Sequence, residues 1–125
     1  MILDTNALSA VADGDKGAEA VLRNANQVAI PVIVLGEYRY GIQQSRNRRQ
    51  YEAWLSHLLP DCRVLAVDDD TASVYAHVRT ELKRAGRPIP TNDLWIASLV
   101  KQHSMALMSR DLHFGAVPGL RRISW

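Results

Sequence analysis

Short apolar runs alternate with longer helical patterns along the whole chain, and this alternation restricts the fold more than any other feature. The apolar runs are Met1 to Leu3, Val28 to Ile30, Cys62 to Val67 and Met105 to Met108, and a further short one covers Leu120 to Ile123. Helical patterns cover residues 5–11, 16–26, 32–44, 47–58, 71–85 and 93–102, and we expect Thr91 or Asn92 to cap the last of these helices. This order predicts an α/β fold with a central, mainly parallel sheet of four to five strands, the fifth at the edge.

Length and composition describe an ordinary globular chain. With 125 residues the chain is long enough to bury a core, and we expect one domain over residues 1–125. No apolar run approaches the ~18 residues of a membrane span, and no signal-peptide pattern is present. The single cysteine, Cys62, excludes a disulfide framework within the chain. We therefore expect a cytoplasmic protein without membrane contact, whose net charge of +2 permits a polyanionic partner without requiring one.

Four acidic residues stand directly after a predicted strand or where packing would favour an apolar side chain. Asp4 and Asp111 are the last residues of the stretches ILD and MALMSRD, each of which begins with a predicted strand. Glu37 shares a helix face with Val34, and Asp93 heads an apolar stripe on its helix. In parallel α/β sheets, ligands bind beyond the carboxyl ends of the strands where the winding direction reverses. We expect the first and fourth strands to flank this point, so that the four acids converge there.

Each acid also has a purely structural explanation. Asp4 could cap the helix that follows it, and Asp93 would stabilise the first turn of its own helix. Glu37 could be a partly exposed helix residue, and Asp111 a turn residue. These explanations account for each acid alone but not for their joint placement.

Converging carboxylates would have to bind protons or cations. Two carboxylates about 4 Å apart repel by roughly 4 kcal/mol at an effective dielectric constant near 20. Oxygen ligands alone select hard ions such as Mg²⁺ or Mn²⁺. The matching chemistry is metal-assisted hydrolysis of a phosphodiester, in which the ion activates water and stabilises the attacking and leaving oxygens.

Several stretches of this chain resemble the acidic motifs of PIN-domain ribonucleases. Within that family they resemble the VapC-type toxins of bacterial toxin–antitoxin systems. The stretches are ILDTN at the start, GE at 36–37, NDLWIA at 92–97, SRDLHF at 109–114 and VPGLRRI at 117–123. The resemblance implies a three-layer α/β/α fold and a Mg²⁺- or Mn²⁺-dependent endoribonuclease that leaves a 5′-phosphate and a 3′-hydroxyl. It also implies a homodimer, an RNA substrate and a cognate antitoxin that covers the active site.

The same resemblance assigns roles to individual residues. The implied catalytic and metal-binding acids are Asp4, Glu37, Asp93 and Asp111. Asn6 resembles a polar residue that helps to order the first acid. Ser109 stands where the family more often has threonine, a hydroxyl that would orient Asp111 or a water. His113 stands where many relatives carry another aspartate, so the number of acids stays at four.

Two basic clusters are candidates for contacts with RNA phosphates. The first, between two predicted helices, consists of Arg46, Arg48 and Arg49, and a solvated helix connection is its alternative explanation. The second, just before the Asp93 helix, consists of Lys83, Arg84 and Arg87. The acidic run at 68–70 is interpreted instead as favourable charge at a helix N-terminus.

Other functions agree with parts of this pattern. A PIN-fold nuclease in RNA processing outside a toxin–antitoxin system, or a non-catalytic RNA- or protein-binding module, would keep the fold, although four intact acids argue against lost catalysis. A Mg²⁺-binding, receiver-like signalling domain would need paired acids after the first strand, which supplies only Asp4. A phosphatase with an aspartyl nucleophile would need an acid at position 6, which is Asn6.

Overall fold

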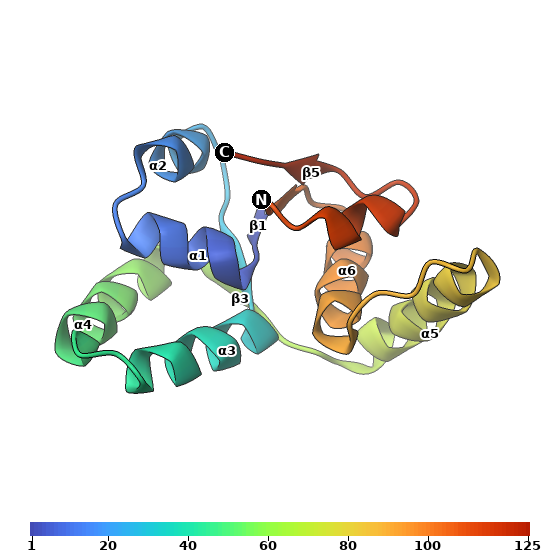
Figure 1. The fold of residues 1–125 in the computed structure, drawn as a ribbon, viewed down its shortest axis with the longest axis horizontal. Helices are drawn as coiled ribbons and strands as arrows, with labels where there is room; N and C mark the ends of the chain where they lie inside the picture. The colour runs from blue at the N-terminus through green and yellow to red at the C-terminus, as the bar shows by residue number, and fades with distance from the viewer.

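The computed structural model describes residues 1–125 and contains one five-stranded sheet with helices around it (Figure 1). The strands are β1 (Ile2–Leu3), β2 (Ala29–Pro31), β3 (Arg63–Leu65), β4 (Leu107–Met108) and β5 (Arg122–Ile123). The helices are α1 (Thr5–Ala12), α2 (Lys16–Arg23), α3 (Val32–Gln43), α4 (Arg48–Leu58), α5 (Asp69–Arg84) and α6 (Thr91–His103), and the 3₁₀ helices are η1 (Leu59–Asp61) and η2 (Leu112–Ala116).

Helices cover both faces of the sheet, as the predicted three-layer α/β/α arrangement requires. In Figure 1, α1 to α4 lie to the left of the strands, whereas α5 and α6 pack together on the right. The strand residues Ile2, Leu3, Ile30 and Leu107 are fully buried, which explains why the strands are continuous apolar runs. The longest helix, α5, has 16 residues, and no helix of the chain could span a bilayer.

All strand pairings are parallel, and the strand order is β3-β2-β1-β4-β5. The chain therefore winds outwards from β1 to β3 and then returns to the other side of β1 for β4 and β5. This places the reversal of winding between β1 and β4, where the sequence predicted it. Leu3 pairs with Met108, and the Asp4 amide donates a hydrogen bond to the Met108 carbonyl (3.3 Å). The residues that follow β1 and β4 therefore meet at the carboxyl edge of the sheet.

The predicted strand over Cys62–Val67 is longer than the observed β3, which covers Arg63–Leu65. β3 is an outer strand whose only partner is the three-residue β2, so pairing stops where β2 ends. The predicted fifth strand is confirmed as β5, at the opposite edge of the sheet.

Side-chain caps explain where several helices begin. The Asp68 carboxylate accepts a hydrogen bond from the Thr71 amide (2.9 Å), and the Thr71 hydroxyl accepts one from the Asp68 amide (3.1 Å). This capping box confirms the interpretation of the acidic run 68–70 as a helix N-terminus. At the other end of α5, Gly86 adopts a positive φ of 67°, a conformation that glycine adopts readily.

The prediction that Thr91 or Asn92 caps α6 is wrong. The helix begins at Thr91 directly after Pro90, and no side chain caps it. The Asn92 side chain instead donates a hydrogen bond to Glu37 (3.1 Å), so it serves the contact between α6 and α3.

Replacing Thr71 by valine tests the capping box. Thr71 is fully buried, and its hydroxyl also contacts the Gln102 side chain on α6. We expect Thr71→Val to lower the free energy of unfolding by about 1–2 kcal/mol, because it leaves polar partners unsatisfied. Thr80→Val is the matched control, since Thr80 is an exposed residue of the same helix. Equal losses in urea unfolding for both variants would contradict the prediction.

Candidate active site

Four acids from distant parts of the chain line one pocket at the carboxyl edge of the sheet. Asp4 follows β1, Asp111 lies three residues beyond β4, Glu37 belongs to α3 and Asp93 lies in the first turn of α6. The other lining residues are Thr5, Asn6 and Ile96. The structure thus brings together all four acids that the sequence singled out.

Asp4 is held between the end of β1 and the start of α1. Its side chain is only 5% exposed, and its Oδ1 accepts a hydrogen bond from the Ala7 amide (2.8 Å). Asp4 therefore caps α1 and lines the acid pocket at the same time, so its two explanations are compatible. Burial raises the pKa of the Asp4 carboxyl; hydrogen bonds from Ser109 and Ala7 lower it, and the charges of Asp111 and Asp93 raise it further.

Ser109 connects the first and last acids. It is fully buried directly after β4, and its hydroxyl is hydrogen-bonded to the Asp4 carboxyl. The same hydroxyl oxygen accepts a hydrogen bond from the Asp111 amide (2.9 Å). Ser109 thus orders the backbone of Asp111, as the hydroxyl was expected to do. Asn6 is exposed on the pocket rim, and the hydrogen bonds to the Asp4 carboxyl come from Ala7 and Ser109.

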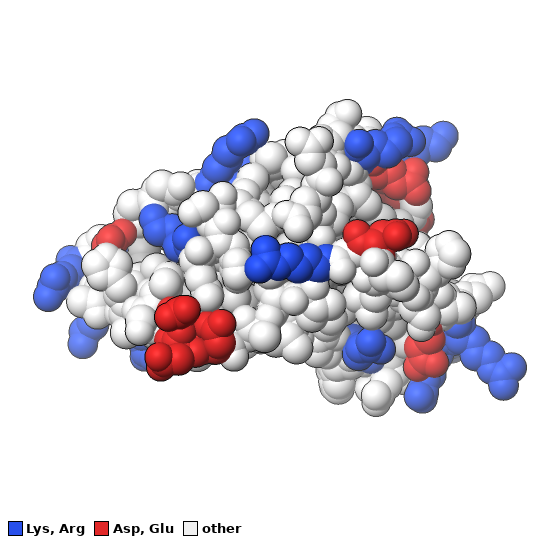
Figure 2. Space-filling view, turned by 180° about the vertical axis from the view of Figure 1, so that it is seen from behind, with Lys and Arg blue, Asp and Glu red and all other residues white.

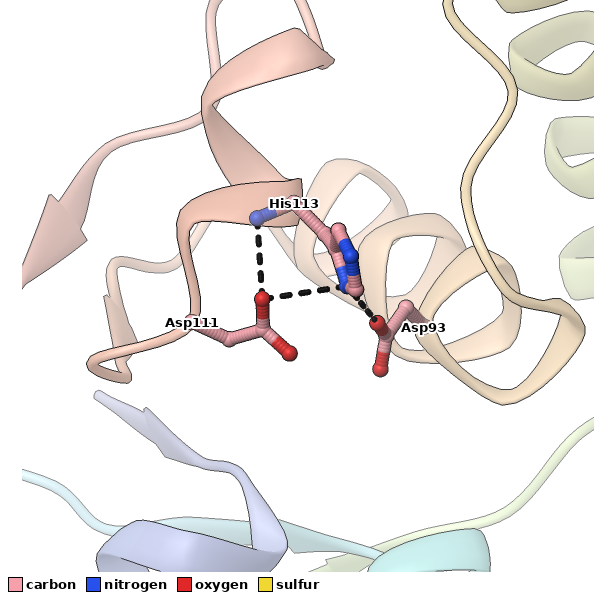
Figure 3. Close-up of side chains that lie close together, drawn as sticks. All are labelled: Asp93, Asp111 and His113. Carbon is pink, nitrogen blue, oxygen red and sulfur yellow. Dashed lines mark hydrogen bonds and ion pairs between the residues drawn. The ribbon is translucent and has the colours of Figure 1, made fainter.

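The His113 imidazole lies between Asp93 and Asp111 (Figure 3). Its Nδ1 is 3.1 Å from Asp93 Oδ2 and 3.1 Å from Asp111 Oδ1. The His113 amide also donates to Asp111 Oδ1 (2.9 Å), which ties the start of η2 to this acid. Burial raises the pKa of the Asp93 carboxyl, the hydrogen bond from His113 lowers it, and the charge of Asp111 raises it.

Two polar residues contact the acids in a way that the sequence patterns did not predict. His113 was only counted as a missing aspartate, although its spacing of two residues from Asp111 fits a side chain that returns to the same turn. Asn92 was interpreted as a helix cap, but it holds Glu37 Oε1. No local pattern indicated this contact, because Asn92 and Glu37 are 55 residues apart in the sequence.

The first basic cluster consists of Arg46, in the connection between α3 and α4, and of Arg48 and Arg49, which begin α4. Arg48 pairs with Glu52 (3.0 Å), one turn along α4, and Arg46 and Arg49 are exposed. On the face of the molecule shown in Figure 2, Lys and Arg side chains stand apart from one another instead of forming one continuous stripe.

The second basic cluster approaches the acids more closely. Arg87 lines a hollow together with the exposed Leu112 and with His113, whose ring contacts Asp93 and Asp111. Lys83 lines a neighbouring groove with Thr91, at the start of α6. Arg84 is exposed near the end of α5. Of the six basic candidates, Arg87 is the one that shares a hollow with a residue that contacts the acids.

The donor groups of the pocket fit a divalent cation. Ligand atoms of Asp93, Asp111 and His113 all lie within 4.8 Å of one another, and the Asp4 carboxyl is hydrogen-bonded to Ser109 beside Asp111. The Thr5 hydroxyl in the pocket lining is buried without a hydrogen-bond partner. Burial is the main cause of the raised pKa values of Asp4 and Asp93, and a cation in the pocket would stabilise both carboxylates in their charged form and offset the added repulsion from their neighbours.

Comparison with known proteins gives a consistent result. The family model described as PIN domain matches residues 1–120. Ribonuclease VapC5 of Mycobacterium tuberculosis is 33% identical over 121 residues, which cover 94% of this chain and 87% of that protein. Ribonuclease VapC2 of Rickettsia felis is 30% identical over 129 residues, which cover 99% and 96%. The crystal structure of VapBC2 from Rickettsia felis, bound to a DNA fragment from its promoter, contains a chain with a TM-score of 0.84 and 28% identity, with coverage of 99% and 97%.

The raised pKa of Asp4 predicts that its charge destabilises the metal-free fold. The folded chain holds this proton at pH values where the unfolded chain has lost it, so stability falls as the pH rises above the usual aspartate range. In EDTA at pH 7, we expect Asp4→Asn to raise Tm by about 3 °C. The difference should shrink as the pH falls towards the usual aspartate range, because the raised pKa lets the folded wild-type chain take up this proton.

Asp61→Asn, at an exposed acid outside the pocket, is the control for this change. A lower Tm for Asp4→Asn than for wild type at pH 7, measured by circular dichroism, would show that the Asp4 charge stabilises the fold.

Proposed function

The chain belongs to the PIN domain family, and from this premise we propose that it is a divalent-metal-dependent endoribonuclease, the toxin of a toxin–antitoxin pair. The relatives named ribonuclease VapC match nearly the whole chain, which supports a nuclease. A cytoplasmic location fits an enzyme whose substrate is cellular RNA.

One observation carries the chemical part of this proposal: four carboxylates converge on a single pocket between the carboxyl ends of β1 and β4. Such a concentration of negative charge would repel an RNA backbone unless a cation were bound. With Mg²⁺ or Mn²⁺ in place, the same pocket attracts a phosphodiester. The catalytic and metal-binding roles of Asp4, Glu37, Asp93 and Asp111 are therefore proposed together with the ion.

Asp4 and Glu37 have different roles in this proposal. When bound, the ion supplies positive charge at the scissile phosphate and favours ionisation of the attacking water. Asp4 directly follows β1, is held in place by hydrogen bonds with Ala7 and Ser109, and contributes a carboxylate to the pocket. Glu37 is held through Oε1 by Asn92, and its other carboxylate oxygen is free to accept a proton from water.

A second groove supports the proposal of an antitoxin partner. It shares Thr5 and Glu37 with the acid pocket and extends past Tyr38 to Tyr51. An antitoxin segment seated there would end at the acids and could block them. The structural relative from Rickettsia felis is a toxin–antitoxin complex, which supports a partner of this kind.

We also propose that the chain forms a homodimer. Val32, Val64 and Val67 are 45%, 46% and 38% exposed, at or just beyond the outer strand β3 and its neighbour β2. Pro31 pairs with Leu65, so Val32 and Val67 follow the same ends of adjacent strands. A second copy that covered these side chains would remove their apolar surface from water.

RNA cleavage by the purified chain tests the proposed activity. With Mg²⁺ or Mn²⁺ present, we expect wild type to cut RNA internally and Asp4→Asn to lose roughly 100-fold or more of the rate. EDTA should abolish cleavage, and added metal should restore it. Asp69→Asn, at an exposed acid of α5, should cleave like wild type. Activity that survives both EDTA and Asp4→Asn would overturn the mechanism.

The salt dependence of RNA binding tests the basic residues. In the Asp4→Asn background, we expect Arg87→Ala to weaken binding and to reduce the slope of log K against log salt by about 0.7–0.9, the loss of one phosphate contact. The double variant of Arg48 and Arg49 to alanine tests the first cluster in the same way. Arg23→Ala, on α2, is the control. An unchanged slope would remove the altered residues from the RNA interface.

A further inference from the structure

His113 lines the hollow beside the acid pocket, and its imidazole is the one nitrogen donor in the cluster that it forms with Asp93 and Asp111. Its Nδ1 faces two carboxylate oxygens at the same distance, 3.1 Å, and the ring lies between Asp93 and Asp111 (Figure 3). The other two ligand atoms of this cluster are carboxylate oxygens. His113 therefore changes the chemical character of the site and not only its charge.

We propose that His113 makes the pocket a mixed nitrogen–oxygen site that prefers first-row transition ions, Mn²⁺ or Co²⁺, over Mg²⁺. The proposal rests on the proposed function, since it concerns the ion that the nuclease uses. Imidazole is a good ligand for transition ions, whereas Mg²⁺ favours oxygen ligands. With an all-carboxylate set the pocket would lack this discrimination.

The distances fit coordination by both kinds of donor. Neighbouring ligands of an octahedral ion stand roughly 3 Å apart when metal–ligand bonds are about 2.1 Å. The two distances from Nδ1 to the carboxylates match this separation, and all three ligand atoms lie within 4.8 Å of one another. An ion placed among them would replace the hydrogen bonds of the imidazole without a large movement of the ring.

The backbone favours this position of the ring. The His113 amide donates to Asp111 Oδ1 (2.9 Å), and the Asp111 amide is in turn held by Ser109 (2.9 Å). The side chain is 53% exposed, so an ion can approach from solvent. In the alternative role, His113 would stay hydrogen-bonded to the acids and would not bind the metal. The metal preference would then be unchanged when His113 is replaced, and bound Mn²⁺ would show no ¹⁴N signal.

Metal binding without RNA tests the proposal. We would titrate wild type, His113→Asp and the control His77→Asp with Mg²⁺, Mn²⁺ and Co²⁺ by calorimetry. His77 is an exposed residue of α5 whose side chain is 81% exposed. We expect wild type and the control to bind Co²⁺ and Mn²⁺ at least tenfold more tightly than Mg²⁺. In His113→Asp, the preference for Co²⁺ over Mg²⁺ should fall at least fivefold.

Spin-echo spectroscopy of Mn²⁺ bound to wild type gives a result that does not depend on how the variants fold. Modulation from a coordinated ¹⁴N nucleus supports the proposal, and its absence overturns it. An unchanged ratio of affinities in a folded His113→Asp variant also overturns it. Wild type that shows the ¹⁴N signal but cuts no RNA would refute the proposed nuclease and leave the metal preference standing.

Discussion

Repulsion among the carboxylates at the ends of β1 and β4 is the constraint on which the rest of the structure depends. Fixed hydrogen-bond donors stabilise these carboxylates. The Ala7 amide and the Ser109 hydroxyl are bonded to Asp4, and Asn92 donates to Glu37. The His113 side chain lies between Asp93 and Asp111 and contacts both. These donors compensate only in part, since the pKa values of Asp4 and Asp93 stay raised, mainly by burial and further by the neighbouring charges. Folding stability must therefore come from the buried strands and from the contact of α5 with α6.

The strand order brings the four acids together from distant parts of the sequence. Asp4 and Asp111 are more than a hundred residues apart in the sequence, but the return of the chain to β4 places them on neighbouring strands. α3 starts directly after β2, so Glu37 lies one turn beyond the same edge of the sheet. α6 begins without a side-chain cap, which leaves its first turn free to present Asn92 and Asp93 to the pocket. The site thus depends on the strand order more than on any one loop.

The parallel sheet, the adjacency of its first and fourth strands and the convergence of the acids could be predicted from the sequence because they follow from simple patterns. Apolar runs and helical spacing gave the elements, and an acid after each of two strands located the site. The length of β3 and the start of α6 could not be predicted, since the first depends on pairing with β2 and the second on a contact with Glu37 across the fold. The contact between His113 and Asp93 could not be predicted for the same reason, because it exists only once α6 and η2 are adjacent.

Histidine at position 113 reduces the electrostatic cost of the site and narrows the choice of ion at the same time. An aspartate there would give the pocket a fifth carboxylate and increase the repulsion that must be overcome before any metal binds. Histidine keeps four carboxylates, the charge that two divalent ions neutralise, and adds a ligand that can be neutral. In our proposal, the nitrogen that limits the repulsion in the metal-free chain also discriminates against Mg²⁺. Stability without metal and preference among metals would then both depend on this side chain.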